Sequence, residues 1–345
     1  MICDKVYRLR VREHSAHPQY IAWMLNGEEM VQKLEAMKSG ISDSGLNLKQ
    51  AEFLALALPL PPLSEQRRIV ARIEALFIRT GRARADLERI APLSLAYRRG
   101  ALDQTFATAA DQGPTVALGS LVSAIEAGKN ILCDERLPSP GENGIVKISA
   151  VTWGQFDPKA IKTAPHVAIL DPRSRIANGD FLMSRANTLE LVGAPVIADN
   201  VPADTYLSDK VLRLRFHEAT ARWILWFLRS PAGRREIEAR SSGNQLSMRN
   251  IGQGALRAIP IPMPHAQYRS LAIAAIERGQ ECTAIIEQEA ARGRALLDRL
   301  ERGILERAFR GELVSQDASH DDTESPATPP TAPLNPVTVH RRKHA

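Results

Sequence analysis

The sequence predicts an α+β fold, with globular segments of mixed α/β structure joined by two long antiparallel coiled-coil helices. The chain nearly repeats itself, since residues 4–10 return as residues 209–215 and residues 99–102 return as residues 302–305. Each repeat also contains a proline-rich hinge followed by a long heptad pattern of apolar and small side chains. A hydrophobic content of 44% is enough for packed cores and excludes a wholly disordered chain.

The repeat divides the chain into five expected segments. They are residues 1–62, the C-terminal remnant of a first globular domain; residues 63–110, a first long helix; residues 111–262, a complete globular domain; residues 263–314, a second long helix; and residues 315–345, a proline-rich disordered tail. The first globular domain is expected to be incomplete, because only three residues precede its repeated block. The second copy of that block follows about a hundred residues of its own domain.

The two long helices are expected to pair along a heptad seam. The seam residues are Ile69, Ile73, Leu76, Leu87 and Ile90 in the first helix and Ile276, Ile286, Leu297, Leu300 and Ile304 in the second. Antiparallel pairing returns the chain from one end of the coil to the other, as two linked repeats require. Two independent amphipathic helices, each packed on its own domain, are the alternative. Pro92 is expected to kink or interrupt the first helix, because proline lacks the backbone N–H of a helix interior.

Charge and cysteine content narrow the class of protein. The net charge is +6, and residues 112–262 contribute 18 Lys and Arg against 14 Asp and Glu. A basic domain is the electrostatic footprint of a nucleic-acid binder, although many mildly basic domains bind no nucleic acid. Three isolated cysteines favour a reducing compartment, so a cytoplasmic location is expected. The sequence has no apolar run of the roughly 18 residues that span a bilayer.

The motifs of common catalytic sites are missing from the sequence. It contains no glycine-rich phosphate loop, and it lacks the Asn/Asp-Pro-Pro-aromatic tetrapeptide of adenine methylation. Its carboxylates are scattered, whereas a metal-dependent nuclease needs them clustered. The only histidines at a possible metal-ligand spacing are His14 and His17, for which an exposed loop is the more natural interpretation. We therefore expect no catalytic activity, metal or cofactor.

Three polar stretches of the complete domain have side chains suited to DNA recognition. They are residues 146–155, 180–188 and 241–249, and solvated turns are the alternative interpretation. The candidate DNA-contacting residues are Lys147, Ser149, Thr152, Arg185, Asn187, Thr188, Lys210, Ser242, Asn244, Gln245 and Arg249. Arg can pair bidentately with guanine, and Asn or Gln can pair with adenine. We expect the Arg, Asn and Gln residues to share one face, with the two lysines nearer the phosphates.

Four blocks of the sequence resemble a known family. Residues 58–74 and 300–313 resemble the conserved regions of type I restriction–modification specificity (S) subunits, and residues 146–154 and 179–187 resemble the target-recognition domain of that family. The resemblance implies that residues 111–262 are a target-recognition domain for double-stranded DNA. It implies that helix length sets the spacing of two half-sites. It also implies that methyltransferase (M) and restriction (R) subunits are the partners, and that catalysis belongs to them.

This chain departs from the family pattern at its start. The first recognition domain lacks the part equivalent to residues 112–208, so the chain is expected to be an N-terminally truncated member of the family. A misassigned start, a truncated gene and a half-subunit form would each explain the departure. The alternative function is a helical assembly protein that joins partner subunits and has lost sequence-specific DNA binding. A self-contained nuclease is disfavoured by the scattered carboxylates.

Overall fold

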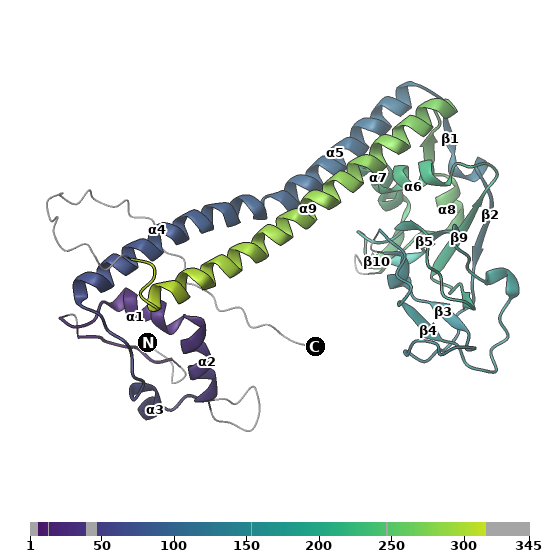
Figure 1. Cartoon of the computed structure of the whole chain (residues 1–345). Coiled ribbons are helices and arrows are strands. Elements are labelled where there is room, and N and C mark those ends of the chain that lie inside the picture. The colour runs from purple at the N-terminus through teal and green to yellow at the C-terminus, as the bar shows by residue number, and fades with distance from the viewer. Residues whose placement is uncertain (1–5, 13, 39–46, 153, 246–247, 315–345) are drawn as a thin grey trace. The chain divides into compact units, whose positions relative to one another are not determined.

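The computed structural model describes residues 6–12, 14–38, 47–152, 154–245 and 248–314 (Figure 1). Its internal contacts divide the chain into two compact units. Unit 1 contains residues 1–84 and 295–345, and unit 2 contains residues 85–294. The boundary falls within the two long helical segments, so each unit contains one part of each.

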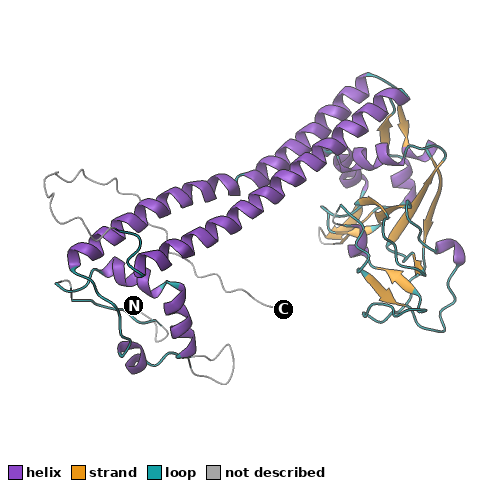
Figure 2. Ribbon diagram, in the orientation of Figure 1, coloured by secondary structure: helices purple, strands orange, loops and turns teal. Residues whose placement is uncertain are grey.

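In unit 2, helix α5 (Ile90–Asp111) lies beside the first part of helix α9 (Ala266–Phe309) (Figures 1 and 2). The Tyr268 hydroxyl donates a 3.2 Å hydrogen bond to the carbonyl oxygen of Thr105. Further along, Arg98 forms a 2.6 Å salt bridge with Glu287. Residue numbers fall along one helix as they rise along the other, so the pair is antiparallel. Gly293 allows a close approach, because a Cβ atom there would lie 3.0 Å from the Leu87 side chain.

In unit 1, helix α4 (Leu63–Glu88) packs against the last part of α9. Ile69, Val70 and Ile73 share a buried cluster with Ile304, Leu305 and Ala308, in an order that is again antiparallel. Arg84 reaches Glu301 at 2.8 Å and Asp298 at 2.9 Å. The first helix is interrupted between α4 and α5, just before Pro92, as the sequence predicts.

The predicted fold class is confirmed, but two of the expected seam residues are wrong. Ile286 and Leu300 are 50% and 53% exposed, so they lie outside the face between the helices. The neighbouring positions Glu287 and Glu301 face the partner helix instead and form salt bridges with arginines. The seam therefore passes through Glu287 and Glu301, one residue after the expected positions. Apolar spacing alone could not predict this, because it excludes charged residues from the seam. Among the other expected positions, Ile69, Ile73, Ile276 and Ile304 are buried and Leu76, Leu87, Ile90 and Leu297 are half-buried.

The globular part of unit 2 is built on a four-stranded antiparallel sheet in the order β2-β9-β5-β7. These strands are β2 (Val122–Ala127), β9 (Val211–Phe216), β5 (Phe181–Ser184) and β7 (Pro195–Ile197). Helices α6 (Ala221–Arg229), α7 (Pro231–Arg240) and α8 (Gln253–Arg257) complete the core. Residues 223–240 have a helical pattern that Pro231 interrupts, and α6 ends at Arg229 while α7 begins at Pro231.

Three smaller sheets surround this core. Strand β1 (Thr115–Ala117) pairs with β12 (Pro260–Pro262), and β3 (Gly144–Val146) lies between β4 (Ile161–Thr163) and β8 (Thr205–Tyr206). Strand β11 (Met248–Asn250) lies between β10 (Ser242–Gln245) and β6 (Ala186–Asn187). Short 3-10 helices cover Leu118–Ser120, Ile148–Val151 and Pro172–Ser174.

Unit 1 contains three short helices, α1 (Pro18–Leu25), α2 (Glu28–Ala36) and α3 (Gln50–Leu54). Apolar and basic residues alternate over residues 6–12, which predicts a half-buried strand, but this segment is extended without strand pairing among the described residues. Val6 and Leu9 are 57% and 44% exposed there. The equivalent segment of unit 2 is β9, which lies between two strands of a sheet. Alternating side chains make a strand only where a neighbouring strand takes up its backbone hydrogen bonds.

The repeat seen in the sequence is also present in the packing. In unit 2 the Phe106 ring packs on Trp223 with centroids 4.6 Å apart, and the Trp223 indole donates to the carbonyl oxygen of Pro262. In unit 1 the Phe309 ring packs on Tyr20 at 5.5 Å, and the Tyr20 hydroxyl donates to the carbonyl oxygen of Pro59. A long helix therefore reaches the same kind of aromatic and hinge contact in both units. No helix among the described residues is long and apolar enough to cross a membrane.

The Ile73→Asp variant should lower the free energy of unfolding by roughly 3–5 kcal/mol, because Ile73 has no exposed surface and an aspartate would bury an unpaired charge. Ile78→Asp in the same helix is the matched control, since Ile78 is 57% exposed, and it should cost less than about 0.5 kcal/mol. Denaturant unfolding followed by circular dichroism measures both. Equal unfolding midpoints for the two variants would contradict the helix packing of unit 1.

Candidate nucleic-acid interface

The three-stranded sheet β10-β11-β6 joins two of the polar stretches that are far apart in the sequence. Arg249 on β11 lies opposite Asn187 on β6, and Gln245 on β10 lies opposite Met248. Gln245 is exposed and Asn187 is half-buried. The sheet therefore brings together amide side chains from residues 180–188 and 241–249. The side chain of Asn244 and residues 246–247 lie outside the described part of the chain.

Arg185 lies at the edge of this sheet, between it and residues 208–210. Its backbone N–H donates to the carbonyl oxygen of Lys210 at 2.8 Å, and its own carbonyl oxygen accepts from Ile251 at 3.0 Å. These two bonds fix the backbone from both sides. The guanidinium makes one long hydrogen bond, 3.5 Å, to the carbonyl oxygen of Asp209. A guanidinium with most of its donors outside such bonds is suited to bidentate contact with an external acceptor.

Arg249 occupies a different environment from Arg185. Its Nε donates to Ser241 Oγ at 3.1 Å, its Nη1 donates to the Gly243 carbonyl oxygen at 2.9 Å, and its Nη2 donates to the Ser241 carbonyl oxygen. The side chain therefore binds the backbone of its own hairpin. These bonds hold β10 against β11, and the base-reading role of Arg249 stays a prediction.

Thr152 also differs from the expectation. It is only 7% exposed, and its hydroxyl donates to the carbonyl oxygen of Ser149 at 3.2 Å. A buried, internally bonded hydroxyl terminates the short 3-10 helix and does not face an external ligand. Ser242 and Thr188 lie beside the sheet, where the Ser242 hydroxyl donates to the Asn250 carbonyl oxygen and the Thr188 backbone N–H donates to Asn187 Oδ1.

A basic cavity of about 340 Å³ lies next to Arg185, and we call it the lysine cavity. Its polar lining includes Lys129, Asn130, Glu135, Lys147, Ser149, Lys162, Ser208, Asp209 and Lys210. Three of the sequence candidates, Lys147, Ser149 and Lys210, thus lie together. Sequence reasoning missed Lys129 and Lys162. Lys162 is brought in by strand pairing, because it lies opposite Ile145 where β4 pairs with β3.

Glu135 is the acidic partner within the lysine cavity. Its carboxylate contacts Lys147 Nζ at 2.7 Å and Lys162 Nζ at 2.6 Å. Hydrogen bonds from Lys147 and Lys162, together with their positive charges, hold the pKa of Glu135 at about 2. Glu135 is therefore ionised at neutral pH. Neither Lys129 nor Lys210 forms a salt bridge within the part of the chain that the structure describes.

A buried arginine fixes the strand that leads to Arg185. Arg213 on β9 is 1% exposed, and it forms salt bridges with Glu126 on β2 and, at 2.9 Å, with Asp180 just before β5. It also donates to the carbonyl oxygens of Arg173 and Arg175. Burial opposes ionisation of Glu126, but hydrogen bonds from Arg213 and Arg215 outweigh it and lower the pKa of Glu126. The alternation of leucine and arginine over residues 212–215 could not predict that Arg213 is buried while Arg215 is exposed.

Two further arginines hold the segment that follows β6. Arg234 on α7 donates to the carbonyl oxygens of Leu189 at 3.0 Å and Val192 at 2.7 Å. Arg229 on α6 donates to the carbonyl oxygen of Pro195 at 2.9 Å, and burial lowers the pKa of Arg229 to about 10. Arg234 therefore anchors the backbone that follows Asn187 and Thr188, and Arg229 anchors the start of β7. This places the polar end of β5 and β6 on a rigid support.

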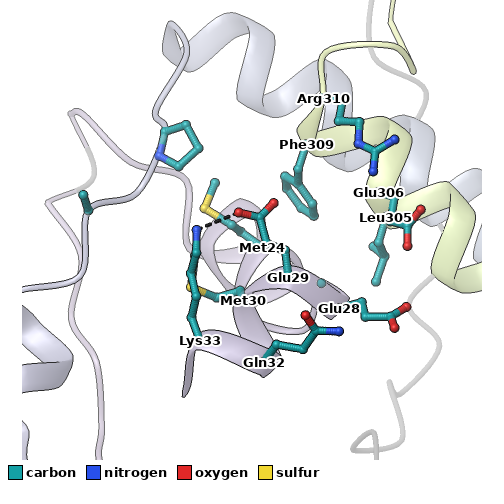
Figure 3. Close-up of a pocket in the computed structure, with 13 residues that line it drawn as sticks. Met24, Glu28, Glu29, Met30, Gln32, Lys33, Leu305, Glu306, Phe309 and Arg310 are labelled. Carbon is teal, nitrogen blue, oxygen red and sulfur yellow. Dashed lines mark hydrogen bonds and ion pairs between the residues drawn. The ribbon is translucent and has the colours of Figure 1, made fainter. Parts of the chain in front are cut away.

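Unit 1 contains a different cavity, of about 400 Å³, which Figure 3 shows in close-up. Met24, Leu305 and Phe309 contribute apolar surface to it, and a 2.6 Å salt bridge joins two of its own side chains, Glu29 and Lys33. Its lining therefore mixes acidic, basic and apolar groups. The lysine cavity has the stronger positive character and is the better candidate for an anionic ligand. Among the described residues, no group of three His, Cys, Asp or Glu side chains could hold a metal ion.

No protein-family model matches the chain. Its sequence is 29% identical over 166 residues to the EcoEI specificity subunit of Escherichia coli, covering 46% of this chain and 27% of that protein. It is 24% identical over 297 residues to the EcoKI specificity subunit of Escherichia coli strain K12, covering 82% and 63%. It is 23% identical over 314 residues to the StySPI specificity subunit of Salmonella potsdam, covering 87% and 66%.

The chain is therefore similar in sequence to type I restriction enzyme specificity subunits. The chain spans 27%, 63% and 66% of the lengths of these three curated proteins. Its fold is also that of solved structures. It superposes with a TM-score of 0.58 and 21% identity on the HsdS subunit of Thermoanaerobacter tengcongensis, covering 88% of this chain and 73% of that one. A chain from a type I restriction–modification system gives a TM-score of 0.60 at 21% identity, covering 88% and 74%.

The Arg213→Met variant should lower the free energy of unfolding by roughly 3–5 kcal/mol, because Asp180 would lose its buried partner. Arg215→Met is the matched control on the same strand, since the Arg215 side chain is 48% exposed, and it should cost less than about 1 kcal/mol. Guanidinium unfolding followed by intrinsic tryptophan fluorescence measures both. A small effect of Arg213→Met would show that the Arg213 network does not support the sheet.

Proposed function

We propose that this protein is a DNA sequence-specificity subunit of a type I restriction–modification complex, with its working recognition domain in residues 111–262. It binds double-stranded DNA, joins modification and restriction subunits, and carries out no catalysis of its own. One observation carries the proposal. Residues 180–188 and 241–249, which are polar and far apart in the sequence, meet in the sheet β10-β11-β6 beside a cavity lined by four lysines. The similarity to named specificity subunits supports it independently.

The sheet and the cavity suit different parts of a DNA duplex. Base edges are read by amide and guanidinium groups, which Asn187, Gln245 and Arg185 supply at the sheet. Phosphates are bound by lysine ammonium groups regardless of sequence, and Lys210 at the cavity is exposed for this role. Base reading and phosphate binding are thus assigned to adjacent surfaces of one domain. Such adjacency lets phosphate contacts fix the register in which bases are read.

The paired helices carry the second half of the proposal, which is the docking of partner subunits. In unit 2 several large apolar side chains lie on the outer surface of the pair, although the seam between the helices is already filled. They are Leu93, Leu95, Tyr97, Leu271, Ile285 and Ile286, each at least 50% exposed. Exposed apolar side chains mark a protein–protein interface where they form one contiguous patch, and the proposal takes these residues to form such a patch. A methyltransferase subunit is the proposed occupant, and restriction subunits join the complex through it.

A helical assembly protein that has lost sequence-specific DNA binding is the rival proposal. It shares the partner-docking surface and differs only at the recognition domain. The rival predicts that a randomised duplex library retained by the protein shows no enriched sequence. The specificity-subunit proposal predicts an enriched motif from the same experiment.

Arg185→Ala should relax the enriched motif at one base position and weaken binding of that motif by about 1–3 kcal/mol, because one bidentate base contact is lost. The measurement is selection from a randomised duplex library, followed by fluorescence anisotropy with the selected duplex. Lys159→Ala is the control, since Lys159 is exposed and lies outside the lysine cavity. An Arg185→Ala variant with unchanged motif and affinity would contradict the base-reading role.

Lys210→Ala should instead leave the motif unchanged and weaken binding of all duplexes alike. The slope of log affinity against log salt should fall by about one, because one phosphate contact and its released counterion are lost. Anisotropy titrations between about 50 and 200 mM KCl measure the slope. A change of motif without a change of slope would contradict the assignment of Lys210 to the phosphates.

Ile286→Asp should change the free energy of unfolding by less than about 0.5 kcal/mol, because Ile286 is 50% exposed. The same variant should weaken co-purification with the modification subunit. Glu289→Ala on the same helix is the control for a general surface effect, since Glu289 is exposed and pairs only with Arg292 in the described structure. Undiminished co-purification of the Ile286→Asp variant would place the docking surface elsewhere.

A further inference from the structure

The loop of residues 129–136 is held at both ends against the lysine cavity. At its start the backbone N–H of Gly128 donates to the carbonyl oxygen of Ser208 at 3.1 Å. Near its end Asp134 and Thr163 exchange two backbone hydrogen bonds of 3.0 Å. The next residue, Glu135, is therefore set beside β3 and β4 by the backbone. This anchoring brings the Glu135 side chain within reach of Lys147 and Lys162.

The geometry of Glu135 is that of an anion bound between two lysines. One carboxylate oxygen contacts Lys147 and the other contacts Lys162, and the Lys147 ammonium also lies 3.5 Å from the backbone carbonyl oxygen of Glu135. A phosphodiester likewise carries one negative charge shared over two oxygens. The two anions are therefore equivalent ligands for this pair of ammonium groups.

A second, independent feature points to an oxygen-rich ligand in the same cavity. Ser208 lines the cavity, and its hydroxyl oxygen is buried without a hydrogen-bond partner among the residues that the structure describes. A buried hydroxyl without a partner costs free energy, and native structures usually satisfy it with a ligand or water. Lys129 and Lys210, which have no salt bridge of their own there, add positive charge to the same lining.

We propose that the lysine cavity is a binding site for a phosphate of the DNA backbone, and that Glu135 occupies it as a competing carboxylate which the phosphate displaces. This inference rests on the proposed function, since it takes DNA as the ligand. Glu135 then lowers affinity for every duplex without changing which bases are read. Lys147 and Lys162 stay neutralised while the protein is free of DNA and become phosphate contacts when it is bound.

Glu135→Gln tests the proposal, because glutamine keeps the size of the side chain and removes its charge. The full chain should bind a labelled random-sequence duplex roughly three- to tenfold more tightly at about 50 mM KCl. The slope of log affinity against log salt should become steeper by about one to two. The reason is that Lys147 and Lys162 no longer pair with the Glu135 carboxylate and can both contact phosphate. Glu135→Gln with Lys162→Ala should lose about half of the added slope.

Glu142→Gln is the matched control for the loss of one negative charge. Glu142 follows the same loop, is held by Arg136 and the backbone N–H of Ser139, and does not line the lysine cavity. Its removal should change affinity less than about twofold. Unfolding midpoints of all variants, measured in parallel, report whether each variant folds.

The outcomes separate the inference from the function on which it rests. If the parent binds duplex DNA and Glu135→Gln binds it with the same affinity and salt slope, the competing role of Glu135 is overturned and DNA binding stands. If Glu142→Gln tightens binding as much as Glu135→Gln, a general charge effect explains the result and the site is overturned. If neither the parent nor Glu135→Gln binds any duplex, the proposed function itself fails.

Discussion

The structure depends on one packing constraint, which is that the ends of the long helices are part of the globular cores. Leu102, Phe106 and Ala109 of α5 are buried in the core of unit 2 with Trp223 and Phe227. Ile304, Leu305 and Ala308 of α9 are buried in the same manner with residues of α1 and α4 in unit 1. Each core is therefore completed by a helix from the other repeat. Antiparallel pairing satisfies both cores at once, because it returns each helix end to the unit that it completes.

Some charged side chains of unit 2 are bound within the fold, and others are free to meet an external ligand. The degree of burial largely distinguishes the two groups. Arg213 is 1% exposed and meets two carboxylates and two carbonyl oxygens, so its charge is used in holding β9 to β2 and β5. Arg249 binds its own hairpin. Arg185 and Lys210 lie at the surface of the same domain with few internal partners. A basic net charge therefore overstates the positive charge available at the surface, since several arginines are bound internally.

Two lysines of the lysine cavity belong to neither group, because they are paired inside the protein but remain near the surface. Lys147 and Lys162 are paired with an internal anion, but that anion is an exposed carboxylate on a loop and not a buried group of the core. A pair of this kind is weakly stabilising in water and exchanges its anion readily. The buried pair of Arg213 cannot exchange in this way, because an unpaired charge there would be desolvated. Position in the fold therefore decides whether an ion pair is fixed in the core or can exchange its anion.

The sequence by itself determined the repeat, the two long helices, the break before Pro92 and the polar stretches within residues 111–262. These features are local or periodic, and the chain's own residues specify them. Tertiary structure decided that Ile286 and Leu300 lie outside the seam, that residues 6–12 are extended but unpaired, and that Lys162 and Glu135 meet Lys147. Periodicity reports which side chains share a face, but which partner covers that face is set by contacts between segments distant in the chain. For the same reason Arg213 and Arg215 alternate identically in sequence, and only the strands on either side of β9 bury one of them.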